Sequence, residues 1–203
     1  SDGMNYWEKD FYDYSTNHAL ALVGFKPNET NQMLVIAYDK DRNEADAQQL
    51  LTFITPPLPA KFPTYTVLTN QPDQMEPGYF LLVIHRAYQI VGNYIAILDN
   101  SGNVVWYSPV PATSSGSGDY NDVRQLDNGD LFLQLPQPSN EFIEINMLGQ
   151  IVRTWQPPAQ YPINDHEGIV TSHDTILYLS DATEVVPNFP TSDTNPNAPL
   201  ITT

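Results

Sequence analysis

The sequence contains no cysteine, which excludes disulfides and thiolate metal sites but does not identify a cellular compartment. Lysine and arginine are scarce, with 8 of them against 24 Asp and Glu, so the formal net charge is −16. A surface this acidic repels phosphate backbones and anionic lipid headgroups, which argues against nucleic acid as a partner. The chain also has no apolar run of membrane-spanning length, and we expect no insertion into a membrane.

Apolar and aromatic residues are plentiful enough for a packed core. Hydrophobic residues make up 41% of the 203 positions, and 12 Tyr and 8 Phe are among them. A chain of this length allows one large or two small domains. Little lysine together with abundant Asn, Thr, Tyr and Pro is typical of exported proteins, so we predict a periplasmic or extracellular location.

One pattern occurs twice in the chain. Residues 94–107 read YIAILDNSGNVVWY, and residues 142–155 read FIEINMLGQIVRTW. Asp99 aligns with Asn146 and Gly102 aligns with Gly149, both at an offset of 47. Each copy is an alternating apolar run, a polar turn ending in Gly, and a second strand-like run, which predicts a β-hairpin whose Gly has positive φ.

A second kind of segment follows each hairpin. Residues 122–135 (DVRQLDNGDLFLQL) follow the first and residues 166–179 (HEGIVTSHDTILYL) follow the second, aligned at an offset of 44 by Asp122 and His166. A hairpin plus the segment after it makes four strands per unit, and a spacing of about 45 residues is typical of β-propeller blades. The chain holds about two such blades, whereas a closed ring normally needs four or more.

Residues 1–58 differ from this repeat. The runs FKPNET (residues 25–30), VIAYD (35–39) and RNEA (42–45) resemble the second half of a fibronectin type III domain, with Gln32 where that family usually has Tyr. The resemblance implies a partial fibronectin III/Ig-like β-sandwich, incomplete at its N-terminal side.

The predicted fold class is therefore all-β, with a partial fibronectin III/Ig-like sandwich followed by about two blades of a β-propeller. Residues 59–63 belong to a stiff Pro-rich linker, since proline restricts φ. Residues 64–203 are the propeller portion, incomplete at its C-terminal side. Within it we expect a short strand at residues 64–70, and beyond Asp181 a long surface loop with a strand starting near Leu200.

The strongest functional pattern is Asn164-Asp165-His166-Glu167, at the head of the inner strand of the second unit. The innermost strand of a propeller begins at the central channel, so a His there faces the place where ligands bind. A His side chain can act as nucleophile, general base or oxyanion partner near neutral pH. The alternative is a structural His that caps a turn and hydrogen-bonds a neighbouring blade.

Taken in order, these pieces resemble the bacterial arylsulfotransferases, which are exported β-propeller enzymes that move a sulfuryl group from one phenolic ester to another phenol. The resemblance covers most of residues 20–181. Besides the N-terminal module and the linker, it rests on MEPGYFLLV (75–83), AILDNSGNVVWY (96–107), DVRQLDNGDLFL (122–133), FIEINMLGQIVRTW (142–155) and DHEGIV (165–170).

The resemblance implies a role for particular residues. An H-H-D segment opens an inner strand in that family, and the matching residues here make His166 the candidate catalytic residue, for sulfate binding or acid/base work. The predicted substrate-binding residues are Asn164, Asp165 and Asp122, and Asp165 stands where the family has its first His. Asn164 would donate to a sulfate oxygen, and Asp122 would orient a neighbouring His or bind substrate hydroxyls, although both could instead cap turns. The family's nucleophilic His and channel Arg lie in later blades and have no match in this chain.

The implied partners are a small phenolic sulfate donor and a phenol acceptor, with self-association into a homo-oligomer left open. The implied reaction requires no metal and no diffusible cofactor, because His and Arg side chains stabilise the charge that develops on the departing phenolate and the sulfuryl oxygens. Enzymatic activity would depend on later blades supplying the remaining His and Arg. The alternative is a non-catalytic extracellular protein for adhesion, glycan binding or assembly, which the acidic charge and Asp165 fit equally well.

Overall fold

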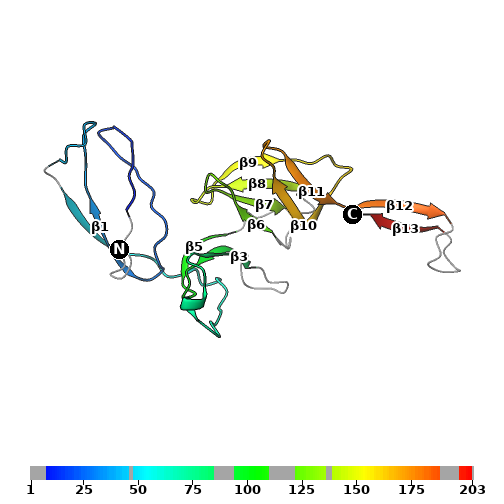
Figure 1. Ribbon diagram of the computed structural model, residues 1–203, viewed down its shortest axis with the longest axis horizontal. Coiled ribbons are helices and arrows are strands. Elements are labelled where there is room, and N and C mark those ends of the chain that lie inside the picture. The colour runs from blue at the N-terminus through cyan, green and yellow to red at the C-terminus, as the bar shows by residue number, and fades with distance from the viewer. Residues whose placement is uncertain are drawn as a thin grey trace. The chain divides into compact units, whose positions relative to one another are not determined.

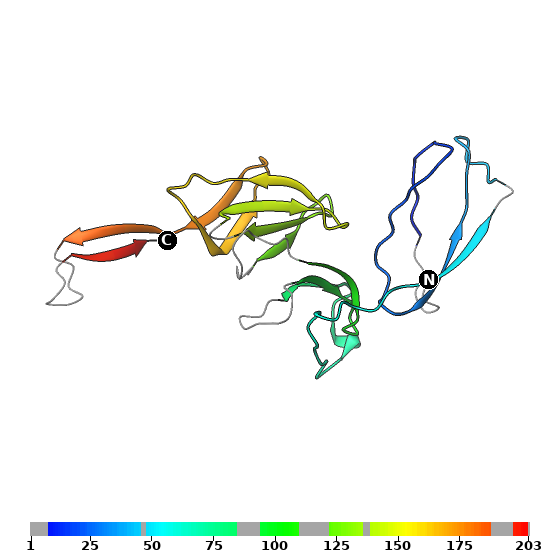
Figure 2. The ribbon, with the colours of Figure 1, turned by 180° about the vertical axis from the view of Figure 1, so that it is seen from behind.

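The fold is all-β, as the alternating runs predicted. The computed structural model describes residues 8–45, 48–84, 94–109, 122–135, 139–187 and 197–202; for residues 72, 165, 182–187 and 197–202 it describes the backbone alone (Figure 1, Figure 2). In these ranges the only helical element is the single 3-10 turn η1 (Pro72–Gln74). Among the described residues we find no helix that could span a lipid bilayer.

The described strands form five small sheets, of which three have two strands, one has three and one has four. The chain divides into two compact units, of which the first comprises residues 1–80 and 96–107, and the second residues 81–95 and 108–203. The domain boundary expected at residues 59–63 stays a prediction, as does the fibronectin-like nature of residues 1–58.

The N-terminal part of the first unit is a long hairpin. Strands β1 (Thr30–Val35) and β2 (Gln49–Ile54) pair antiparallel along their whole length. The charged loop between them is closed by a bridge from Tyr38 to Glu44. Inside that loop the carboxylate of Asp39 accepts backbone N–H groups of Asp41 and Asn43 at 2.8 and 2.9 Å, so its oxygen is used by the turn itself.

The predicted strand at residues 64–70 is wrong. This segment makes no ladder among the described residues, and it is attached instead by side chains to the turn of the first repeated hairpin. The hydroxyl of Tyr65 donates to the carbonyl of Gly102 at 2.6 Å, and Val67 packs directly on the same glycine. The turn connects β4 (Tyr94–Leu98) with β5 (Val104–Pro109), and β4 also pairs with β3 (Phe80–Ile84).

Both repeated hairpins turn through the same five-residue loop, at residues 99–103 and 146–150. The N–H of the first residue donates to the carbonyl of the fifth, and the N–H of the fourth donates to the carbonyl of the first, at 2.8–3.0 Å. The fourth residue has positive φ, 80° at Gly102 and 74° at Gly149. The glycines are needed because a side chain disfavours this conformation.

One four-stranded antiparallel sheet joins segments of the two predicted units. It pairs residues 122–135 with the hairpin that follows them. The predicted unit, a hairpin joined to the segment after it, is therefore wrong. Only five residues separate β7 (Leu131–Leu135) from β8 (Glu141–Ile145), and these two strands pair directly. Its two central strands are buried on both faces. The four strands follow one another in sequence order, and the propeller architecture stays a prediction. The sheet consists of β6 (Val123–Gln125), β7 (Leu131–Leu135), β8 (Glu141–Ile145) and β9 (Ile151–Trp155).

The next sheet packs on this one through aromatic rings. It consists of β10 (Ile163–Val170) and β11 (Ile176–Ser180), and β10 contacts β7. Phe132 and Phe142 stack with ring centroids 5.3 Å apart, and Tyr178 of β11 meets Phe142 edge-on at the same distance. Such pairs contribute about 0.5–1.5 kcal/mol each beyond the burial of their area.

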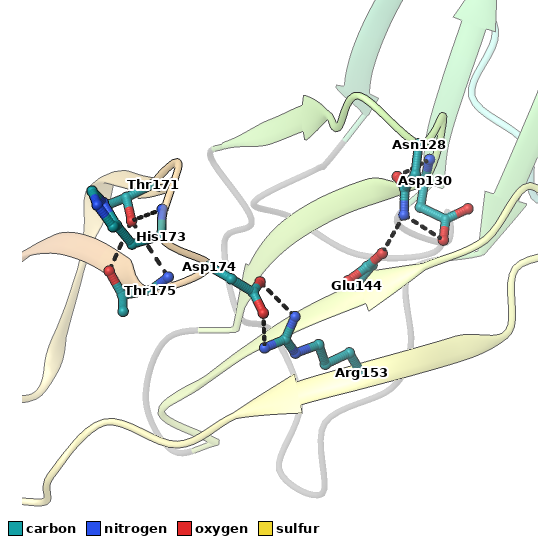
Figure 3. Close-up of polar contacts among 8 residues, drawn as sticks. All are labelled: Asn128, Asp130, Glu144, Arg153, Thr171, His173, Asp174 and Thr175. Carbon is teal, nitrogen blue, oxygen red and sulfur yellow. Dashed lines mark hydrogen bonds and ion pairs between the residues drawn. The ribbon is translucent and has the colours of Figure 1, made fainter.

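An ion pair joins the two sheets at their rim. Arg153 of β9 donates both terminal nitrogens to Asp174 in the β10–β11 turn, at 2.6 and 2.8 Å (Figure 3). The same guanidinium lies 4.3 Å from the centroid of the Trp155 ring. The pair lowers the pKa of Asp174, chiefly through the hydrogen bond from Arg153. Both partners are exposed, so the aromatic rings, and not this pair, hold the sheets together.

The expected surface loop beyond Asp181 is only partly correct. Strands β12 (Ala182–Pro187) and β13 (Asn197–Thr202) pair antiparallel from Ala182↔Thr202 to Pro187↔Asn197. The expected strand near Leu200 exists and begins three residues earlier. The proline of β13 is tolerated because each strand of a two-stranded sheet has a free edge.

Gly149 and Gly129 provide a matched test of the turn geometry. Both have positive φ, 74° and 91°, but an added Cβ at Gly149 would lie 2.7 Å from Ser108 Oγ, whereas one at Gly129 would meet nothing within 4 Å. Gly129→Ala should cost about 1–2 kcal/mol for the left-handed backbone alone. Gly149→Ala should cost more, as measured by urea unfolding. Equal losses would show that the approach of Ser108 is unimportant.

The lowered pKa of Asp99 predicts that the stability of the protein falls in acid. Burial raises the pKa of Asp99, but hydrogen bonds from Asn103 and Ser101 and from the Lys26 ammonium outweigh it, so the pKa in the folded protein is lowered. The resulting stabilisation is complete above the unfolded pKa, about 4, and is lost as pH falls through the lower folded value. Asp99→Asn should therefore flatten the loss of stability in acid.

The variant should keep the turn, because Asn146 occupies the same place in the second hairpin and accepts backbone N–H groups of Leu148 and Gln150. Thermal unfolding between about pH 2 and 7 measures the effect. Parallel pH profiles for the variant and the parent would contradict it.

Candidate functional site

The segment predicted to carry the chemistry, residues 164–167, lies in a break of the β10–β11 ladder. Ile163 pairs with Ser180, and the next pair is Gly168 with Tyr178. Four residues of β10 thus stand opposite a single residue of β11, which is a large β-bulge. Bulges take side chains out of the regular alternation of a strand and are frequent beside active sites. We call residues 164–167 the bulge.

Asn164 shapes the bulge from within. Its Oδ1 accepts the backbone N–H of His166 at 3.0 Å, and its Nδ2 donates to Asp181 Oδ1, just past the end of β11, at 2.8 Å. The side chain is half-buried. Both ends of the amide are engaged inside the protein, so the predicted contact with a sulfate oxygen would have to use the second N–H of Nδ2 beside the bond to Asp181.

Gln134 of β7 reaches the bulge from the neighbouring sheet. Its side chain is 1% exposed. With the amide oriented to satisfy both of its ends, Oε1 accepts the N–H of Gly168 at 2.8 Å and Nε2 donates to the carbonyl of Asn164 at 3.1 Å. The opposite orientation would set the oxygen against that carbonyl and leave a single 3.4 Å contact to Asp122. Sequence reasoning did not identify Gln134.

Arg124 connects the bulge with Asp122. Its Nε donates to Asp122 Oδ2 at 3.0 Å, and its Nη2 pairs with the carboxylate of Glu167 in the bulge. The structure thus brings Asp122 to the segment with which it was aligned. Arg124 was also missed, although the run Asp-Val-Arg was a usable signal, because residues two apart on a strand share a face.

His166 itself is exposed, and its backbone N–H is held by Asn164. The side chain of Asp165 lies outside the described residues, so its predicted place in the substrate-binding set stays a prediction. His173 occupies an exposed position in the turn at residues 171–175 (Figure 3), where its backbone N–H donates to Thr171 Oγ1 at 3.2 Å.

The charges around the bulge are mainly negative. Arg124 stands between Asp122 and Glu167, which leaves one uncompensated negative charge on this group of three. A sulfuryl group is an anion, and Arg124 is the cation of this group that can donate to it, either with N–H groups not used by the two carboxylates or by releasing one of them. Across the described residues no group of three or more His, Asp or Glu side chains is placed to hold a metal ion.

A family model described as arylsulfotransferase (ASST) matches residues 64–195, which is more than half of the chain. Searches of the curated proteins and of the solved structures found no match. The matched range includes Asp122, Gln134 and the whole bulge.

Gly168 tests how closely the bulge must approach the four-stranded sheet. A Cβ at this position would lie 2.7 Å from Phe142 Cε1 and 3.2 Å from the end of the Gln134 amide. Gly168→Ala should force β10 away from β7 and destabilise the protein by about 1–3 kcal/mol, the usual cost of overpacking. Urea unfolding followed by tryptophan fluorescence measures the loss. A variant as stable as the parent would mean that the two sheets separate easily.

Proposed function

The chain belongs to the arylsulfotransferase family, and from this premise we propose that it transfers a sulfuryl group from a phenolic sulfate ester to a phenol. The observation that supports the proposal most directly is the position of His166, on a bulge held by three different side chains within the matched range. A bulge that is held this firmly keeps a reactive group in one place, and positioning of this kind lowers the barrier to reaction.

In the proposed reaction the S–O bond to the donor phenol oxygen breaks, and a bond from sulfur to the acceptor oxygen forms. The departing phenolate takes up a proton and the acceptor phenol loses one. We assign His166 to acid/base work or to binding of the sulfuryl oxygens, since imidazole exchanges protons near neutral pH. No metal and no diffusible cofactor enters these steps.

Asp122 and Asn164 have supporting roles in the proposal. Asp122 holds Arg124, whose side chain is 42% exposed and can turn a donor toward a sulfuryl oxygen when it releases Glu167. Asn164 holds the backbone of His166 through its own Oδ1. Asp165 completes the set in place of the first His of the family pattern.

The proposal extends to location and partners. Sulfate esters and phenols of small size would be the substrates, met in the periplasm or outside the cell. The second candidate function is non-catalytic binding of a surface ligand, and the uncompensated carboxylate beside Arg124 favours it. The two functions predict different outcomes in a turnover assay.

Release of a coloured phenol from an aryl sulfate, with a phenol acceptor present, tests the function in the intact protein. His166→Ala should lower kcat by about 10²- to 10⁴-fold, the usual contribution of a positioned acid or base. His173→Ala is the matched control and should leave kcat unchanged, because His173 lies in an exposed turn outside the bulge. Turnover unaffected by His166→Ala would remove this residue from the mechanism, and no turnover at all would favour the binding function.

A further inference from the structure

A buried amide in an apolar strand is the feature that the proposed function leaves unexplained. Strand β7 reads LFLQL, and all five of its side chains are buried. The corresponding strand β11 reads ILYLS, and when the turns 126–130 and 171–175 are aligned, Gln134 falls on Leu179. Burying an amide without hydrogen bonds is costly, so a glutamine in this place needs a reason.

The bulge supplies that reason. When four residues of β10 face one residue of β11, backbone groups at both ends of the bulge lose their ladder partners. The amide of Gln134 satisfies one group at each end, the carbonyl of Asn164 and the N–H of Gly168. A leucine such as Leu179 could do neither.

The fit depends on close approach of the two strands. Gly168 has no Cβ, which lets its backbone come within hydrogen-bond distance of the Gln134 amide while Phe142 fills the adjoining space. The amide of an asparagine, one methylene shorter, would not reach the carbonyl of Asn164 and the N–H of Gly168. Gln134 therefore matches the bulge in length, polarity and position.

We propose that Gln134 is a positioning residue for His166: it ties the two ends of the bulge to β7 and thereby fixes the backbone that carries the histidine. This role rests on the proposed function for its effect on turnover, but its effect on the bulge is independent of any activity. Gln134 touches no substrate in this scheme.

Two measurements on the intact protein test the proposal. Gln134→Met keeps the size of the side chain and removes both hydrogen bonds, so the amide hydrogen of Gly168 should exchange about tenfold faster, by NMR. The same variant should lower kcat for aryl sulfate by about 10- to 100-fold with little change in KM, as expected when a reacting group is displaced but binding is kept. Gln125→Met, at an exposed position of β6, should change neither quantity.

Gln134→Asn separates polarity from geometry. It keeps a buried amide but is one methylene shorter, so it should behave like Gln134→Met and not like the parent. Unchanged exchange at Gly168 in both variants would overturn the proposal, and so would faster exchange with unchanged kcat in an active protein. If the parent shows no turnover while Gly168 exchanges faster in the variants, the proposed function fails and the tie between Gln134 and the bulge stands.

Discussion

The packing of Tyr178 on Phe142, which in turn stacks on Phe132, is the interaction on which the position of the bulge depends. These rings join two sheets that share no backbone hydrogen bonds in the described residues, so their relative position is set by side chains. Ring contacts of this kind are directional as well as apolar. Only because they hold β10 against β7 can a side chain of one sheet reach the backbone of the other.

The polar contacts at this boundary follow from the bulge. A regular strand would have satisfied its own backbone groups, and the break at residues 164–167 passes that task to side chains. Gln134 from β7 and Asn164 from the bulge itself share it, while Arg124 from β6 pairs with the side chain of Glu167. These contacts come from separate elements, so the bulge is held from several directions although His166 remains exposed.

Local features were predictable from the sequence, whereas contacts between segments were not. The glycine and Asx pattern identified both repeated turns, because the backbone hydrogen bonds that close each turn lie within five consecutive residues. Alternation located the strands but did not say which edges meet, and the grouping of the four-stranded sheet was therefore missed. Residues 64–70 alternate like a strand, yet their side chains bind a turn. Gln134 resembled an ordinary polar interruption, because its partners lie in a break that only the folded register reveals.

The acidic balance of the chain constrains how an anionic substrate could reach the bulge. A net charge of −16 slows the encounter with a sulfate ester, and the carboxylates beside Arg124 compete for the guanidinium. Net charge governs the rate of encounter more than the strength of the bound state, which depends on donors that are placed in advance. In the proposed function Arg124 is such a donor, and its partner Glu167 is 48% exposed and can be displaced toward water at small cost. An aryl sulfate whose ring is buried against protein could meet that cost, so the acidic surface and the family's chemistry are compatible.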